Sequence, residues 1–394
     1  MPCRTANRPR KSLWASACTL LLCALAFPLR SRAQSEPTHT PKPVTPPLDI
    51  TIPIAPQAFQ AAGKWHLVYE LHVANLGKWD CTLTRVEVLA AGKKNEPLAS
   101  FAEKNLEAII DHPGQKAAEN PKIPPANFAV IYLWLTLDHL EDVPPTLRHR
   151  LAMKIGDYPE AITLEGVPVT VNKSPVPIIN PPLRGENWLS ANAPSNSSLH
   201  RRALIPINGR ATISQRFAID WAQLYPEGKT YRGDKSDNKS YRAYGAEIHA
   251  AANGTVTEIK DGIPQNIPGP TSRAVPITLE TIGGNHVIIQ IGEGLFAYYG
   301  HMQPGSLRVK VGDKIRQGEV LGLVGNSGNS TEPHLHFQIC NANSGLASEG
   351  LPFALASYNL QGNGWTFTPA DSSAQPAKRE LEIPLENDVV TFAP

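Results

Sequence analysis

Two histidines separated by one residue, His334 and His336, stand in the stretch NSTEPHLHFQIC. The apolar residues after them are typical of a β-strand, in which side chains two positions apart point to the same face and start about 6.6 Å apart. Two imidazoles that share one small volume are suited to bind a divalent metal ion, since neutral histidine is the commonest metal ligand. Two histidines on a solvated sheet face would have the same spacing, so the surrounding sequence decides between the two interpretations.

The surrounding segments resemble the core of one peptidase family. Their glycine turns, Tyr-x-x-His and His-Leu-His follow one another in the order typical of the lysostaphin/LytM-type zinc endopeptidases, which cut peptide bonds in bacterial peptidoglycan. The segments are YGAEIHAAANGTV, GNHVII and AYYGHMQPGSLRVKVGDKIRQGEVLGLVGNSGNSTEPHLHFQI. The resemblance spans residues 198–342. It implies an antiparallel, barrel-like β-sheet of the duplicated hybrid motif type, and one Zn²⁺ per chain.

The resemblance also implies roles for individual residues. His336 is expected to bind zinc, while His334 acts on the water or on the developing oxyanion with His301 as its partner. The zinc-binding aspartate of the family lies in an HxGxD segment, which RFAID matches here, so the resemblance implies Asp220 as a second ligand. Gln338 stands where the family usually has a glutamate.

One expected ligand is missing from this pattern. Arg216 occupies the position four residues before Asp220, where the resemblance implies a zinc-binding histidine. An arginine stays protonated and has no lone pair to donate to a metal ion. Either the site is inactive or another side chain substitutes, and the nearest candidate is His200. The expected metal ligands are therefore His200, Asp220 and His336.

The position of His200 depends on a predicted hairpin. The dipeptide Asn208-Gly209 is a strong signal for a tight turn between two strands. A two-residue loop would put His200 on the sheet face opposite to Asp220, whereas a three-residue loop or a bulge would put both on one face. We expect the second arrangement, in which His200 reaches Asp220.

The first 33 residues are typical of a secretory signal peptide. Basic residues precede the apolar run LWASACTLLLCALAF, and the small-residue site SRA ends just before Gln34. The apolar run is shorter than the ~20 residues that span a bilayer, and no later run is longer, so we expect no transmembrane segment in the mature chain. The protein is therefore predicted to be exported, to the periplasm or to the medium.

Removal of this leader changes the charge of the chain. The leader holds six Lys and Arg, so the 37 basic residues fall to 31 against 35 acidic residues, a net charge of −4. The basic surface that nucleic-acid binding requires is not expected. Two cysteines remain, Cys81 and Cys340, and a disulfide between them is allowed in an exported protein but not implied by their spacing.

The mature chain divides by composition into all-β regions joined by proline-rich segments. Alternating apolar residues, as in KWHLVYELHVAN, predict an N-terminal immunoglobulin-like β-sandwich whose partner is unknown. Short strands between glycine turns predict the metallopeptidase-like domain. The expected order is a signal peptide (1–33), a Pro-rich linker (34–48), the sandwich (49–172), a second Pro-rich linker (173–197), the metallopeptidase-like domain (198–345) and a C-terminal extension without an assigned role (346–394).

These features predict an exported zinc metalloendopeptidase. Its substrate is expected to be a peptidoglycan peptide or another peptide, cleaved by zinc-activated water with His301 and His334 outside the metal ligand set. The first alternative is a non-catalytic module of the same fold that binds the cell wall or activates a hydrolase, and Arg216 favours it. The second alternative, a cupin-like oxygenase, would require a glutamate a few residues after the histidine pair and another histidine further on, and neither follows His336 in this way.

Overall fold

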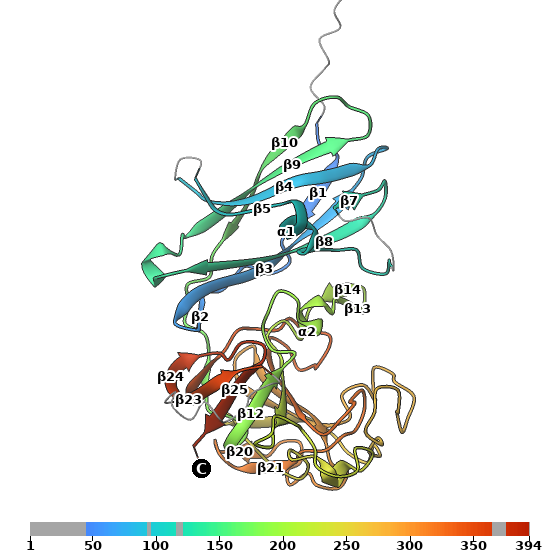
Figure 1. Cartoon of the computed structure of the whole chain (residues 1–394), viewed down its shortest axis with the longest axis vertical. Coiled ribbons are helices and arrows are strands. Elements are labelled where there is room, and N and C mark those ends of the chain that lie inside the picture. Colours follow the sequence, from blue (N-terminus) through green and yellow to red (C-terminus); the bar gives the residue numbers. More distant parts are fainter. Residues whose placement is uncertain (1–44, 93–95, 116–120, 365–375, 394) are drawn as a thin grey trace, which may run out of the picture. The chain divides into compact units, whose positions relative to one another are not determined.

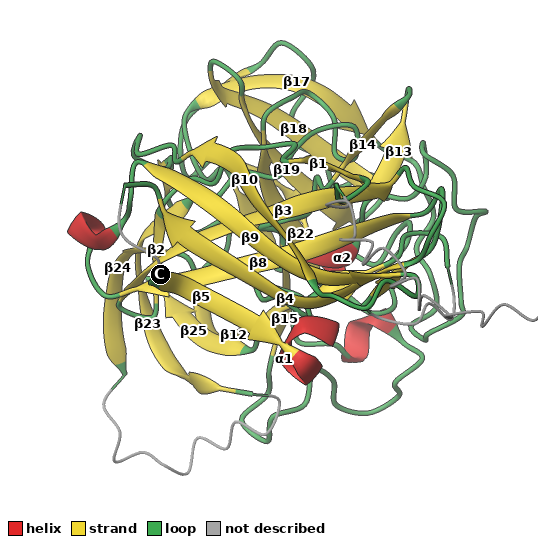
Figure 2. Cartoon of the chain, turned by 90° about the horizontal axis from the view of Figure 1, so that it is seen from above, coloured by secondary structure: helices red, strands yellow, loops and turns green. Residues whose placement is uncertain are grey.

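The computed structural model describes residues 45–92, 96–115, 121–364 and 376–393. The predicted signal peptide and most of the first linker lie outside the described residues, so both stay predictions. None of the described helices has the length and apolar character needed to cross a membrane. Strands dominate the described residues and the helices are short (Figure 2). The helices are α1 (Glu103–Glu107), α2 (Leu199–Arg202), η1 (Leu140–Asp142) and η2 (Asn238–Ser240).

The N-terminal region consists of two antiparallel sheets (Figure 1). Their strands are β1 (Leu48–Thr51), β2 (Phe59–Ala61), β3 (Lys64–Asn75), β4 (Cys81–Ala90), β5 (Pro97–Ala102), β6 (Ile110–Asp111), β7 (Lys122–Ile123), β8 (Phe128–Leu137), β9 (Thr146–Ile155) and β10 (Ile162–Thr170). One sheet has the order β1-β3-β8-β6, with β2 on β3. The other has the order β10-β9-β4-β5, with β7 on β4.

The burial of β9 and β3 follows from their sequences. Side chains of β9 alternate between buried and half-buried over nearly its whole length, as period-2 patterning requires. The buried hydroxyl of Tyr69 on β3 hydrogen-bonds to His149 Nε2 on β9 at 2.8 Å, so the two sheets pack face to face. The all-β fold class is confirmed, while the immunoglobulin-like topology of this sandwich stays a prediction.

The C-terminal region is built on one large sheet. Within the described residues this sheet has 11 strands in the order β11-β23-β25-β12-β15-β22-β19-β18-β17-β20, with β24 on β23. Its strands are β11 (Ile178–Ile179), β12 (Gly185–Ala191), β15 (Ile219–Gln223), β17 (Gly254–Lys260), β18 (Asn285–Gly292), β19 (Leu295–Met302), β20 (Lys314–Ile315), β22 (Leu335–Cys340), β23 (Ala354–Asn363), β24 (Ala377–Glu382) and β25 (Asp388–Phe392). Two small pairs accompany it, β13 (Ile205–Ile207) with β14 (Arg210–Thr212), and β16 (Glu247–His249) with β21 (Val320–Leu323).

The expected second linker and C-terminal extension both contribute to this sheet. Residues 173–197 contain β11 and β12, and residues 346–394 contain β23, β24 and β25. Strand β12 lies between β15 and β25, so strands from the two segments pair with each other (Figure 1). A short strand with proline on both sides has the composition of a linker, so it is not recognised from composition. A strand that pairs with a partner far along the chain has no local sequence pattern that indicates the pairing.

A layer of aromatic rings supports the central strands. Phe337 on β22 lies 5.2 Å from the ring of Tyr299 on β19 and 5.5 Å from that of Phe353, measured between centroids. Leu335 and Ile339 are fully buried with Phe337, because alternate residues of a strand share one face. His336 and Gln338 therefore lie on the opposite face, over a closely packed core.

Sandwich stability is expected to depend on the buried face of β3. Leu71→Ala removes a side chain that is 0% exposed and should lower the free energy of unfolding by about 2–5 kcal/mol, because a cavity remains. Leu76→Ala, just beyond the same strand, is the matched control: Leu76 is 74% exposed and its loss should cost at most about 0.5 kcal/mol. Urea unfolding measures both, and equal costs would contradict this packing.

Candidate metal centre

Strand register brings Asp220 and His336 together. Asp220 on β15 lies directly opposite His336 on β22 in an antiparallel pair, so their side chains point to the same face. On its other side β22 pairs with β19, where Gly300 lies opposite His336. Residues that are far apart in the sequence thus become neighbours at the centre of the sheet.

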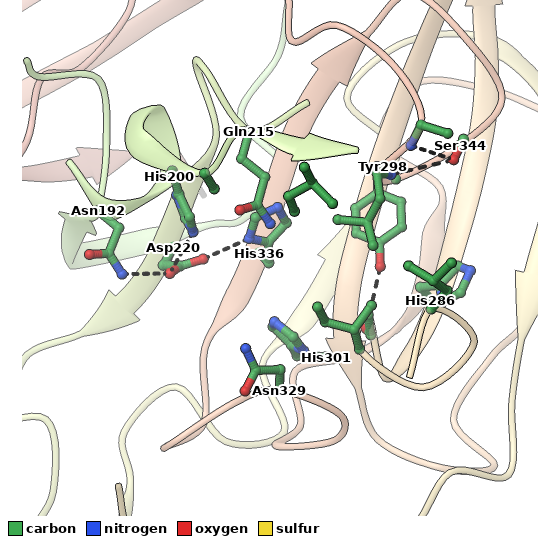
Figure 3. Close-up of a pocket in the computed structure, with 18 of the residues that line it drawn as sticks. Asn192, His200, Gln215, Asp220, His286, Tyr298, His301, Asn329, His336 and Ser344 are labelled. Carbon is green, nitrogen blue, oxygen red and sulfur yellow. Dashed lines mark hydrogen bonds and ion pairs between the residues drawn. The ribbon is translucent and has the colours of Figure 1, made fainter. Parts of the chain in front are cut away.

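The three predicted metal ligands form one buried cluster. Ligand atoms of His200, Asp220 and His336 all lie within 4.8 Å of one another. His200 Nε2 is 3.2 Å from Asp220 Oδ2, and His336 Nδ1 is 2.9 Å from Asp220 Oδ1 (Figure 3). Ligand atoms bound tetrahedrally at about 2 Å from zinc are about 3.3 Å apart. The donor set, its spacing and its chemistry therefore fit a zinc ion with one position left open.

His200 reaches this cluster by a route that differs from the expected one. Ile207 pairs with Arg210, so the loop Asn208-Gly209 has two residues, and the expected wider loop or bulge is wrong. Both loop residues have positive φ, 52° and 79°, as this tight turn requires. His200 nevertheless reaches Asp220, because the hairpin begins only at Ile205 and His200 lies before it, on the short helix α2.

Arg216 lies away from the cluster. Its guanidinium group donates to the carboxylates of Glu70 and Glu349 and to the carbonyl oxygen of Gly350. Arg216 does not line the cavity that contains His200 and Asp220. The residue that stands in place of the family histidine therefore puts no positive charge among the candidate ligands.

His334 is fixed beside the cluster by its Nδ1 atom. This nitrogen donates to the carbonyl oxygen of Glu332 at 2.8 Å and lies 3.2 Å from Ser330 Oγ. His334 Nε2 lies 3.4 Å from Asp220 Oδ1. The ring thus presents Nε2 to the site.

A β-bulge turns His301 toward the site. Tyr299 pairs with Val287, and Met302 pairs with Asn285. Between these two pairs β19 advances by three residues while β18 advances by two, so β19 contains one extra residue. In a regular strand His301 would share the core face of Tyr299, but its φ of 63° re-aims the side chain. Its ring lies 4.9 Å from that of His334 between centroids, and its Nδ1 donates to the Ser327 carbonyl oxygen at 2.8 Å.

Gln338 fixes the tautomer of His336. Its amide nitrogen donates to the carbonyl oxygen of Gly345 at 3.0 Å, so its amide oxygen must face His336 Nε2, at 2.9 Å. That oxygen only accepts, so Nε2 carries the hydrogen and the lone pair of a neutral ring is on Nδ1. Two acceptors, His336 Nδ1 and Asp220 Oδ1, then lie 2.9 Å apart. A proton or a metal cation must stand between them.

The charges of the site favour an ionised carboxylate. Burial would raise the pKa of Asp220, but His200 and His334 hold this pKa well below its ordinary value. Burial lowers the pKa of His334, yet Asp220 outweighs it and raises that pKa above the ordinary value. Burial, together with the neighbouring imidazoles, lowers the pKa of His301 well below the ordinary value.

Asn192 is a member of the site that the sequence did not signal. Its amide donates to Asp220 Oδ2 at 2.8 Å, from the segment that follows β12 (Figure 3). No motif marks this asparagine. Only the pairing of β12 with β15, in which Ala191 lies opposite Asp220, brings it near.

The cluster opens into a cavity of about 650 Å³. His334, His301 and the three candidate ligands lie along it, together with apolar and polar side chains. The apolar residues are Leu199, Ile205, Ile207, Leu279 and Ile282, and the charged or polar ones include Glu258, Arg273, His286 and Tyr298. The cavity is large enough for an extended peptide segment, with the cluster of His200, Asp220 and His336 in its wall.

Comparison with known proteins identifies this region. The model of "Peptidase family M23" matches residues 240–347, which contain His301, His334 and His336. The chain carries a peptidase family M23 domain. The resemblance to lysostaphin/LytM-type endopeptidases predicted from the sequence is thereby confirmed. The match begins after Asp220 and His200, so these two residues are placed by the structure alone.

Several relatives share this M23 domain. The chain is 34% identical to lysostaphin from Staphylococcus simulans over 90 residues, which are 22% of this chain and 18% of lysostaphin. It is 41% identical to the peptidoglycan DD-endopeptidase ShyA of Vibrio cholerae over 56 residues, 14% of this chain and 13% of that one. The chain thus spans less than a fifth of either relative.

Among solved structures, the catalytic domain of the prophage-encoded M23 protein EnpA from Enterococcus faecalis is similar at 22% identity. The alignment covers 45% of this chain and 92% of that one, with a TM-score of 0.26.

The tautomer of His336 can be tested in the metal-free chain. Long-range ¹H–¹⁵N spectra of histidine-labelled protein should show a hydrogen on His336 Nε2, because the Gln338 amide oxygen accepts it, whether or not Nδ1 is protonated toward Asp220. Gln338→Met removes this acceptor and should populate both tautomers. His249, which lies on β16 and contacts the Gly318 carbonyl oxygen, is the internal control and should not change. An Nδ1-protonated neutral ring in the unaltered chain would contradict the assignment.

Proposed function

We propose that this protein is an exported, zinc-dependent endopeptidase that hydrolyses peptide bonds in peptidoglycan. The observation that carries the proposal is the buried cluster in which His336 of the M23 domain meets His200 and Asp220, which precede the matched residues. Peptidases of this family are generally zinc-dependent. A relative named as a peptidoglycan endopeptidase supports the substrate class, and the predicted signal peptide supports export.

The donor set assigns the metal ligands. His200 Nε2, an oxygen of Asp220 and His336 Nδ1 would hold the ion, and their two nitrogens and one oxygen are typical of catalytic zinc sites. A bound zinc ion would supply a water of lowered pKa and a Lewis acid for the scissile carbonyl group. Asn192 and Gln338 keep Asp220 and His336 in the orientation that binding requires.

His334 and His301 are assigned to proton transfer and orientation. Each donates its Nδ1 hydrogen to a backbone carbonyl oxygen, which leaves the Nε2 lone pair of a neutral ring free. His334 Nε2 is next to Asp220, so it is placed to accept the proton of the attacking water and later to return it to the leaving amine. His301, 4.9 Å from His334 between ring centroids, orients the attacking water, because its Nε2 lone pair can accept a hydrogen of that water.

The non-catalytic alternative rests on Arg216. An arginine among the ligands would repel a metal cation, and the site would then serve only to bind the wall. Here the guanidinium group is paired with Glu70 and Glu349, and the ligand atoms of His200 lie within 4.8 Å of those of Asp220 and His336. This arrangement favours the enzyme over the binding module.

Zinc stoichiometry tests the ligand assignment. The purified chain should carry one zinc ion, and His200→Ala, Asp220→Ala and His336→Ala should each lose it on dialysis, because two ligands hold zinc poorly. His249→Ala is the matched control, since this buried histidine contacts Gly318 outside the cluster and its variant should keep the metal. Elemental analysis gives the result. Zinc retained in His200→Ala would overturn the role of His200.

Digestion of purified peptidoglycan tests the activity. The zinc-loaded chain should release new amino groups, a chelator should abolish the release, and added zinc should restore it. His334→Ala should keep its zinc but lose activity about 10²- to 10⁴-fold, because a proton-transfer group is gone. A chain that binds one zinc and releases no peptide from peptidoglycan would instead support the non-catalytic module.

A further inference from the structure

The helix that carries His200 is anchored on the sandwich. Its next residue, Arg201, is fully buried, and Arg201 Nη1 lies 3.1 Å from Glu70 Oε1 on β3. Arg201 Nη2 donates to the carbonyl oxygens of Tyr69 on β3, at 3.2 Å, and Leu133 on β8, at 3.0 Å. The Arg201 side chain therefore binds the sandwich through an ion pair with Glu70 and through hydrogen bonds to two backbone carbonyl oxygens.

The same carboxylate holds the segment that leads to Asp220. Arg216, four residues before Asp220, donates to Glu70 Oε2 from Nε at 3.0 Å and from Nη2 at 2.8 Å. Its Nη2 also donates to Glu349 at 2.8 Å. The chain segments that deliver His200 and Asp220 are thus tied to one side chain of the sandwich.

Further contacts hold the stretch between Asn192 and α2. The amide of Asn196 donates to the Tyr132 carbonyl oxygen at 3.0 Å, and its own oxygen accepts from Arg201 Nε at 3.1 Å. The guanidinium carbon of Arg202 lies 4.2 Å from the Tyr132 ring centroid. The stretch that places both Asn192 and His200 on Asp220 is therefore fixed against β8.

The shared carboxylate is fully desolvated. Glu70 is 0% exposed, and burial alone would raise its pKa, but Arg216 and Arg201 hold it below the ordinary value. A buried charge is stable only when it is paired, so the two arginines and Glu70 fix one another's positions. The cluster therefore joins the sandwich directly to the two segments that carry His200 and Asp220.

We propose that Glu70 is a positioning residue for the metal centre, and that the sandwich is thereby part of the zinc site. Its carboxylate holds α2 and the start of β15 so that His200 meets Asp220 and His336. The inference rests on the proposed function, in which His200 binds zinc. Arg216 stands at the position of the missing histidine ligand. It pairs with the same Glu70 carboxylate that holds Arg201, the residue next to His200.

Zinc affinity of the full chain, measured by competition with a chromogenic chelator, tests the role of Glu70. Glu70→Gln should weaken zinc binding by about 10- to 100-fold, the usual effect of losing a partner that orients a ligand. Glu70→Asp keeps the charge but shortens the side chain by one methylene, so it should fold and still bind zinc more weakly. Glu87→Gln is the matched control, because Glu87 pairs with Arg150 at 3.0 Å within the sandwich and its loss should leave zinc affinity unchanged.

A double-variant cycle separates positioning from general loss of stability. In a His200→Ala background, Glu70→Asp should cause no further loss of zinc affinity, because the ligand that it positions is already gone. Equal zinc affinity in the unaltered chain and Glu70→Asp, together with weak binding in His200→Ala, would overturn the inference and leave the proposed function standing. An equal loss in both backgrounds would also overturn it. An unaltered chain that binds no zinc would overturn the proposed function itself.

Discussion

The Asp220 carboxylate is a negative charge only 8% exposed to solvent, and the surrounding elements are arranged to compensate it. Its Oδ2 contacts His200 and Asn192, and its Oδ1 contacts His336 and His334. Such a charge is tolerated in a protein interior only when both oxygens are occupied. Because the four partners come from α2, from the segment after β12 and from the start of β22, one carboxylate couples the placement of all three.

Regular and irregular backbone contribute differently to this centre. Plain antiparallel register puts Asp220 opposite His336, and the aromatic rings of Phe337 and Tyr299 pack on the other face of β22 and β19. His301 needs a bulge with a positive φ, and His200 needs a short helix docked on another sheet. Local geometry of this kind is maintained only where surrounding contacts fix it, which is the usual condition of a functional site.

Local patterns in the sequence predicted what depends on neighbours along the chain. Period-2 alternation predicted the strands β3 and β9 and the all-β class. The order of the motifs predicted that His334 and His336 belong to a site. The loop length of the hairpin and the pairing of β12 with β25 were not predicted, because register and distant strand pairing leave no local trace. One residue of β3 does indicate a distant contact. Glu70 lies within an apolar strand, and a buried acid there requires a basic partner elsewhere in the chain.

The position of β25 has a consequence for how the chain folds. Leu189 of β12 pairs with Val389 of β25, about 200 positions later, and β25 lies inside the sheet between β12 and β23. Until β25 has been synthesised, β12 keeps one open edge, and closing so long a loop is slow. This edge of the sheet can therefore be completed only after the whole chain has been made. In the incomplete chain, that open edge is a surface on which two copies could exchange strands.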